Sequence, residues 1–165
     1  MSPAWQLPPA AKVYEAFGAL ADGRVHLDEE PQGADHEGRA EVESSGRDRR
    51  YIVEWSADLT SITANDNASY WQGYLGYPAI AVLLAIGALQ ADGAIVGLFA
   101  GVPWHDLNVR FKRDYAAAVD SVLSGLEERG ADRGRIEQEV EGVLARLARL
   151  SLERPPRGRR PPRAG

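Results

Sequence analysis

The sequence predicts an α+β fold, in which a small antiparallel β-meander packs on a central apolar helix beside a C-terminal α-helical hairpin. Three observations lead to this class. Residues 24–63 contain short segments of alternating polar and apolar residues, separated by turn residues. Residues 78–89 are apolar nearly all round, as in a helix at the centre of a core. Two later segments carry apolar residues at three- and four-residue intervals, the period of amphipathic helices.

The N-terminal half supplies the first helix and the meander. A helical pattern begins after Pro8-Pro9 and ends at Asp22-Gly23, where glycine favours a helix stop. The acidic stretch 28–38 contains proline and glycine and reads as an exposed loop. Alternation and turn residues predict short strands at 24–27, 39–44, 51–55 and 61–63.

The C-terminal half is predicted to be helical. Pro78 begins the central helix, and Gly93 to Ala100 forms another short one. Pro103 begins a longer helix that ends near Gly130. Its apolar stripe consists of Leu107, Phe111, Tyr115, Val119, Val122 and Leu126. A last helix over 136–150 carries a matching stripe, so we expect the two helices to pair as an antiparallel hairpin.

Length and charge define three regions. We expect an α+β region at 1–101, the helical hairpin at 102–152 on the same core, and a disordered or polyproline-like Arg/Pro tail at 153–165. The whole chain carries a net charge of −5 and the tail carries +4, so residues 1–152 carry −9. An acidic body of this kind is a poor match for a protein that wraps duplex phosphates.

Composition excludes several classes of protein. The chain has no cysteine, which rules out disulfides and thiolate-bound zinc. The longest apolar run, 77–89, is shorter than the roughly 20 residues that a membrane span needs. No secretory signal pattern is visible at the N-terminus. We therefore expect a cytoplasmic protein with no membrane association; the sequence does not determine its oligomeric state.

The order of elements from about Lys12 to Leu89 resembles the SWIM module, a small zinc-binding unit with a β-hairpin, Cys-x-Cys, a spacer, and Cys-x-His opening an apolar helix. Here the hairpin spans 41–55. The run 62–66, ITAND, stands where Cys-x-Cys and the residues after it would be, and 77–80, YPAI, stands where the helix would open. The resemblance covers about half of the chain and is one of layout, because no diagnostic residue is kept.

The four positions equivalent to zinc ligands are occupied by Ile62, Ala64, Tyr77 and Ala79. None of these side chains coordinates zinc well. The resemblance therefore implies a degenerate, metal-free SWIM-like fold, and we expect no metal and no cofactor. It also implies contacts to proteins or nucleic acids.

The loop at 65–74, NDNASYWQGY, is the candidate site because it gathers amides, a carboxylate and three aromatic rings. Exposed aromatic rings beside amides can stack a nucleobase or anchor a protein partner. The same residues also suit a structural role, since Asn and Asp cap turns. The candidate binding residues are Asn65, Asp66, Asn67, Tyr70, Trp71 and Gln72.

Two functions are consistent with this loop. One is a non-enzymatic adaptor or binding protein that contacts a protein partner or single-stranded nucleic acid. The alternative is a small enzyme or ligand-binding domain, with Asp66 as acid or base and Tyr70 and Trp71 as its walls. No catalytic residue is predicted, because His26, His36 and His105 accompany no nucleophile motif and no phosphate-binding glycine pattern occurs.

Overall fold

The computed structural model describes residues 3–28, 36–156 and 158–163. The predicted loop at 28–38 therefore lies largely outside the described residues. In chain order the elements are α1 (Ala10–Ala21), β1 (Val25–Leu27), β2 (Gly38–Glu43), β3 (Arg50–Trp55), β4 (Ile62–Ala64), the π-helical turn η1 (Ala68–Gln72), α2 (Tyr77–Ala85), α3 (Gly93–Gly97), α4 (Trp104–Arg110), α5 (Tyr115–Glu128) and α6 (Arg133–Arg149). The predicted α+β class is confirmed.

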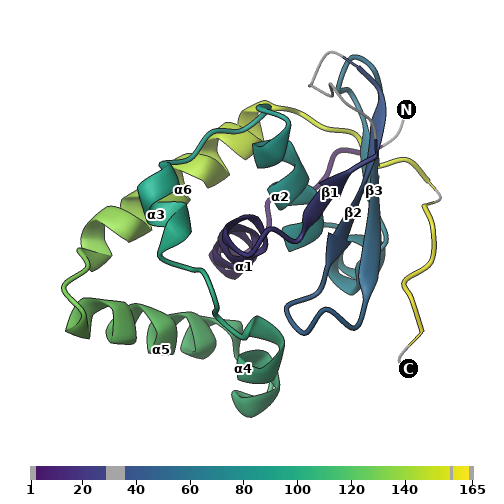
Figure 1. The fold of residues 1–165 in the computed structure, drawn as a ribbon. Coiled ribbons are helices and arrows are strands. Elements are labelled where there is room, and N and C mark those ends of the chain that lie inside the picture. The colour runs from purple at the N-terminus through teal and green to yellow at the C-terminus, as the bar shows by residue number, and fades with distance from the viewer. Residues whose placement is uncertain (1–2, 29–35, 157, 164–165) are drawn as a thin grey trace.

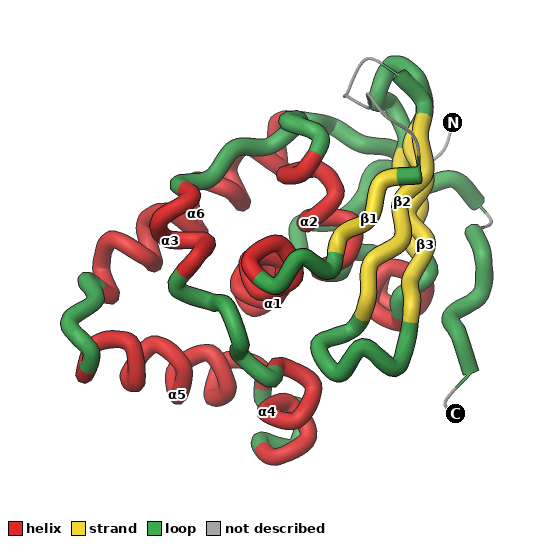
Figure 2. Tube along the Cα trace, viewed as in Figure 1, coloured by secondary structure: helices red, strands yellow, loops and turns green. Residues whose placement is uncertain are grey.

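The fold has a sheet on one side and a layer of helices on the other, with α1 and α2 between them (Figures 1 and 2). The four strands follow one another in the order β1-β2-β3-β4, all antiparallel. This is the meander that the alternating segments predict. In β2 and β3 the register pairs Gly38 with Trp55 and Glu43 with Arg50, so the hairpin is regular along its length.

The inner face of the sheet is apolar and packs on α2. Ala40, Val42, Val53 and Ile62 are at most 1% exposed. Helix α2 is buried on most of its surface and contacts all four strands. Since an all-round apolar helix is stable only inside a core, α2 takes the central place that its sequence predicts.

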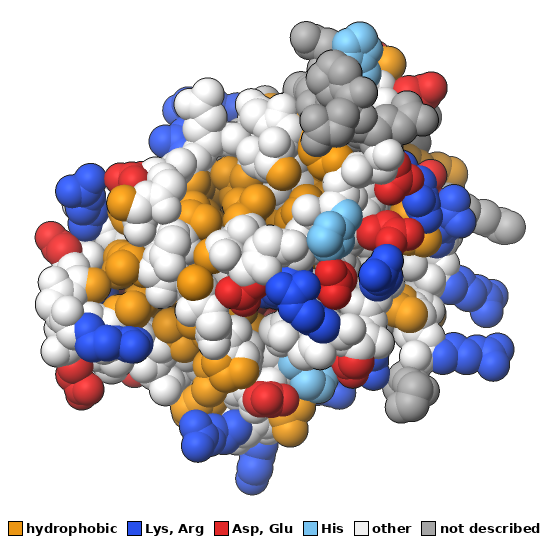
Figure 3. Space-filling view, in the orientation of Figure 1, with side chains coloured by type: hydrophobic (Ala, Val, Ile, Leu, Met, Phe, Trp, Pro, Cys, Tyr) orange, Lys and Arg blue, Asp and Glu red, His pale blue; other side chains and the backbone are white. Residues whose placement is uncertain are grey.

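The outer face of the sheet is charged. Glu41 on β2 lies 3.0 Å from Arg50 on β3 and 3.4 Å from Arg39 on its own strand, and His26 on β1 lies 2.6 Å from Glu43. Figure 3 shows acidic, basic and histidine side chains interleaved over the strands, with hydrophobic side chains gathered over the helices. Such exposed pairs contribute little stability each, so the sheet is held mainly by its inner face.

The helical layer closes on an aromatic cluster centred on Phe99. Its ring centroid lies 5.5 Å from that of Tyr14, 5.9 Å from Phe17 and 6.4 Å from Trp104. All four side chains are buried. Helix α1 is therefore fixed to the turn after α3 and to the start of α4, both of which are distant from it in sequence.

The prediction of one long helix from Pro103 to Gly130 is wrong, because the structure has two helices there, α4 and α5. The backbone enters the left-handed region at Lys112 (φ 54°) and Arg113 (φ 66°), which ends α4. Asp114 then begins α5 by accepting a hydrogen bond from the Ala117 amide at 3.0 Å. The apolar stripe from Leu107 to Leu126, which suggests one helix, is therefore shared by two helices.

The C-terminal segment, for which the sequence predicts a disordered or polyproline-like tail, makes contacts with the body of the protein. Its described residues, 153–156 and 158–163, are hereafter called the tail. The Glu153 amide donates to the Thr60 carbonyl (2.8 Å), and Arg154 donates to the Pro3 carbonyl (2.7 Å). Farther along, Arg159 Nε lies 2.9 Å from Glu54 on the outer face of β3. Pairing with the strand edge holds the tail against the sheet; Arg157 and residues 164–165 lie outside the described part.

Candidate functional site

The loop at 65–74 contains the turn η1, which lies between the last strand and the central helix. Asp66 O accepts the Tyr70 amide at 2.9 Å, and Gly73 ends the turn in the left-handed conformation (φ 79°). Only glycine adopts this backbone without strain. Ser69 Oγ accepts the Gly76 amide at 2.9 Å and so ties the turn to the start of α2.

The structure separates the six predicted site residues into two groups. Asn65 and Asp66 are buried, with 6% and 5% of their surface exposed. Asn65 Oδ1 accepts the Ile52 amide (2.7 Å), and its Nδ2 donates to the Arg160 carbonyl (3.2 Å). This amide therefore joins β3 to the tail. Asp66 Oδ2 accepts the Ser69 amide at 3.2 Å, which shapes η1 from inside.

The other four residues lie at the surface. Trp71 is 68% exposed, Asn67 and Gln72 are exposed, and Tyr70 is half-buried. The rings of Tyr70 and Trp71 meet edge to face, with centroids 4.5 Å apart. An exposed tryptophan held against a tyrosine is a rigid aromatic surface of the kind that binds partners.

Burial raises the pKa of Asp66, and hydrogen bonds from Ser69 oppose this rise. Between the ordinary aspartate pKa of 3.8 and the raised pKa of the folded state, the folded protein binds more protons than the unfolded chain. Asp66 therefore lowers the free energy of unfolding as the pH rises through this interval. Glu15 has a raised pKa through burial too, and acts in the same direction.

We expect Asp66→Asn to gain stability relative to the wild type as pH increases from 4 to 8, because only the wild type must ionise a buried carboxyl at this position. Urea unfolding of both chains at each pH measures the difference. Glu15 is present in both chains, so its contribution cancels. A difference that stays constant across this range would contradict the expectation.

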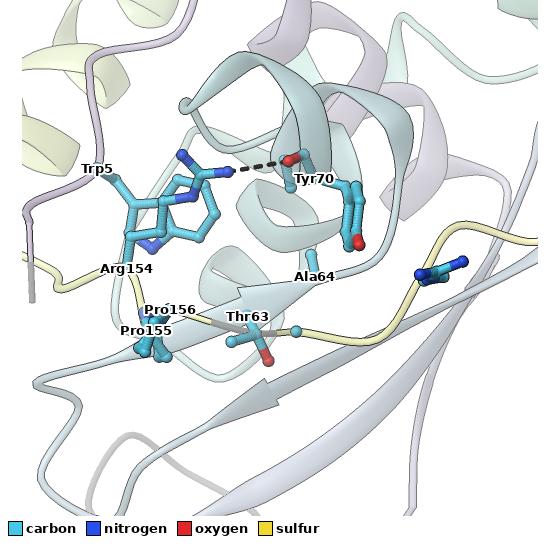
Figure 4. Close-up of a pocket in the computed structure, with 10 residues that line it drawn as sticks. Trp5, Thr63, Ala64, Tyr70, Arg154, Pro155 and Pro156 are labelled. Carbon is cyan, nitrogen blue, oxygen red and sulfur yellow. Dashed lines mark hydrogen bonds between the residues drawn. The ribbon is translucent and has the colours of Figure 1, made fainter.

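Beside η1 lies a cavity of about 580 Å³ between the loop and the tail, hereafter the tail cavity (Figure 4). It is lined by Trp5, Thr63, Ala64, Ser69, Tyr70, Arg154, Pro155, Pro156, Gly158 and Arg160. Of the six residues predicted from sequence, only Tyr70 is among them. Among the described residues that line it, none is a carboxylate or a histidine; these residues supply aromatic rings, hydroxyls and cations.

Arg154 fixes one wall of the tail cavity. Its Nη2 donates to the Tyr70 carbonyl at 2.9 Å, drawn as a dashed line in Figure 4, and its guanidinium lies 5.2 Å from the centre of the Trp5 ring. Trp5 Nε1 in turn donates to the Ile62 carbonyl at 3.0 Å. The two chain ends and η1 are thus held together by one arginine and one tryptophan.

The sequence gives little sign of Trp5, Arg154 and Arg160 as partners of the loop. They lie near opposite ends of the chain, and the tail reads as a separate segment. The one usable signal is composition: arginine and proline in a short tail suit a partner with aromatic rings. Pairing of residues 3–6 with 73–74 and 152–154 brings the ends together.

The four positions equivalent to the zinc ligands of the SWIM module carry apolar or aromatic side chains that lie inside the protein. Ile62, Ala64 and Ala79 are buried, and Tyr77 is largely so. In the described ranges, no three His, Cys, Asp or Glu residues lie close enough to hold a metal ion. Within the same ranges, no helix combines the length and apolar character that crossing a membrane requires.

The fold and the tail cavity together define a small α+β protein with an aromatic and cationic recess at one sheet edge. The chain belongs to the family described as uncharacterised conserved protein UCP014422, whose model matches residues 5–153. The match includes Trp5, η1 and all the helices, and stops at the first residue of the tail. No curated protein and no solved structure matches the chain.

Proposed function

We propose that this protein is a non-enzymatic binding protein that takes single-stranded nucleic acid in the tail cavity and against Trp71. The observation that carries the proposal is the convergence of Tyr70, Arg154 and Arg160 around one recess. Aromatic rings stack on bases of any sequence, and arginine neutralises the phosphates between them.

Size and charge favour a single strand over a duplex. Ligand pockets measure about 300–1,000 Å³, and the tail cavity, at about 580 Å³, falls in that range. A recess of this size suits an unstacked base with its sugar, whereas duplex bases are already stacked. The body carries −9, so phosphates are attracted mainly along the cationic tail.

Binding is favoured over catalysis for this loop. An enzyme that used Asp66 as acid or base would need its carboxylate at the recess, but Asp66 is buried beside Gly76 and does not line the tail cavity. The metal-free SWIM-like hypothesis agrees with a binding role, and it stays a hypothesis based on element order.

The proposal is tested by fluorescence anisotropy with a labelled 12-nucleotide oligo-dT, in 50–300 mM salt. We expect Tyr70→Ala and Trp71→Ala to weaken binding by about 5-fold or more each, since stacking contributes about 1–3 kcal/mol per base. Arg160→Ala should weaken it more than the matched control Arg163→Ala, because both remove one tail charge but only Arg160 lines the cavity.

Two results would overturn the proposal. One is an equal loss of oligonucleotide affinity in Arg160→Ala and Arg163→Ala with no effect of Tyr70→Ala, which would mean that the tail binds only through its positive charge. The other is no binding at 50 mM salt, where electrostatic attraction is strongest. Trp71 would then be assigned to a protein partner.

A further inference from the structure

The tail is held in a slot between the N-terminal segment and the turn that precedes β4. On one side the Arg154 amide donates to the Pro3 carbonyl at 2.7 Å, and on the other the Glu153 amide donates to the Thr60 carbonyl at 2.8 Å. The start of the tail therefore lies like an inserted strand, which satisfies backbone groups of both neighbouring segments. These bonds join the tail to the body, and they form equally well if the tail comes from a second copy of the chain.

Side chains and charge strengthen this docking. Leu152, the residue before the tail, is 4% exposed and belongs to the core. Farther along, Arg159 Nε lies 2.9 Å from Glu54 Oε1 on β3. The segment 153–165 carries +4 against −9 on residues 1–152, so the attraction between tail and body operates between two copies as well as within one.

A short connection links the tail to α6. Helix α6 ends at Arg149, and only Leu150 and Ser151 separate it from the docked Leu152. Ser151 has a φ of 51°, in the left-handed region that residues other than glycine adopt at a cost. This conformation ends α6 and directs the tail onto its own body. If Ser151 adopts helical or extended backbone instead, the tail points away from that body.

Strain in a short hinge favours exchange of the segment that follows it. A dimer in which each copy holds the tail of the other keeps every contact between tail and body and releases both hinges. Release of one left-handed residue favours the dimer by about 10-fold, so two hinges favour it by about 100-fold. The effective concentration of the tail in the monomer is on the order of 1 mM for a short linker, so dimers should form at on the order of 10 µM.

We propose that two copies of this protein exchange their tails about Ser151, so that the slot of one protomer holds the tail of its partner. Figure 1 shows the tail, in yellow, as an arm that leaves the end of α6 and runs beside the sheet at the edge of the molecule. In the dimer, each tail cavity combines Trp5 and Tyr70 of one protomer with the partner's Arg154 and Arg160. The exchange concerns assembly and does not rest on the proposed function.

Substitutions at the hinge should move the equilibrium in opposite directions. Ser151→Gly removes the strain of the closed monomer, since glycine adopts a positive φ freely, and should raise the dimer dissociation constant about 100-fold. Ser151→Val should lower it by about 10-fold or more, because a β-branched residue is a genuine outlier at positive φ. Lys112→Gly is the matched control: it relieves a similar backbone conformation (φ 54°) in the turn after α4 and should leave the constant unchanged. Sedimentation velocity of the full chain over a concentration series measures all of these constants.

Cysteine pairing distinguishes tail exchange from other modes of dimerisation. The chain has no cysteine, so introduced thiols have no competitors. Ala4 and Glu153 form an antiparallel bridge with hydrogen bonds between the neighbouring residues on both sides, which is the close type of pair, with Cα atoms about 4.5 Å apart. A disulfide spans this distance. When a tagged Ala4→Cys chain and an untagged Glu153→Cys chain are mixed and oxidised, we expect a disulfide-linked heterodimer, because the tail of one chain docks on the body of the other.

A Lys112→Cys chain mixed with the Glu153→Cys chain controls for random collision, since Lys112 is exposed in the turn between α4 and α5. The proposal is overturned if the first pair gives no more heterodimer than this control, which would mean that each tail docks only on its own body. It is also overturned if Ser151→Gly and Ser151→Val have the same dimer dissociation constant as the wild type. If Ser151→Val does not fold, the cysteine pair decides. Neither experiment contains nucleic acid, so the outcome is independent of the proposed function.

Discussion

Phe99→Ala is expected to lower the free energy of unfolding by about 3–5 kcal/mol, the usual cost of deleting a fully buried aromatic ring. Phe99 is 0% exposed and lies between Tyr14, Phe17 and Trp104. These partners belong to α1 and α4, which cannot both close onto an alanine. The cavity should therefore persist, and the loss should lie toward the upper end of the range.

Urea or guanidinium unfolding measures this effect as a lower midpoint with an unchanged slope. The melting temperature should fall on the order of 10 °C, given about 2–4 °C per kcal/mol for a chain of this size. Leu98→Ala is the matched control, since this neighbour is 38% exposed and should cost under about 1 kcal/mol. Equal losses of unfolding free energy in the two variants would show that the buried Phe99 ring contributes no more to the stability of the helical layer than its exposed neighbour.

Local patterns predict the elements of this fold well, because each pattern reports a local cause. Alternation gives the strands, since the inner face must be apolar. The all-round apolar segment gives α2, since such a helix has to be central. The break between α4 and α5 is missed because Leu107, Phe111 and Tyr115 keep a four-residue spacing across it. Asp114, a good N-cap, is the one local sign of it.

The candidate sites are less predictable because they depend on contacts between distant segments. The loop at 65–74 is found from composition, but composition does not separate Asp66, which shapes η1 from inside, from Trp71, which faces solvent. The tail cavity needs Trp5 and Arg154, which lie near opposite ends of the chain. Residues so far apart in sequence meet only through tertiary packing.

Gly76→Ala, just beyond the candidate loop, is expected to be a damaging substitution, with a cost of about 3 kcal/mol from overpacking. A Cβ at Gly76 would lie 1.9 Å from Asp66 Oδ2 and 2.7 Å from its Cγ. The backbone of Gly76 (φ −77°, ψ 177°) is one that any residue adopts, so the cost is steric and not conformational. Because Asp66 is buried, its carboxylate has little room to move away.

Gly97→Ala is the matched control, since a Cβ there meets nothing within 4 Å and the position ends α3; it should be neutral or slightly stabilising. The double variant Asp66→Ala/Gly76→Ala tests whether the cost is steric. In an Asp66→Ala background the obstructing carboxylate is gone, so Gly76→Ala should cost far less than in the wild type, with a coupling of about 1–3 kcal/mol. Additive losses would instead mean that Gly76 is needed for its backbone alone. A large coupling would show that Asp66 and Gly76 form one packed unit, which fixes the turn that presents Tyr70 and Trp71 to solvent.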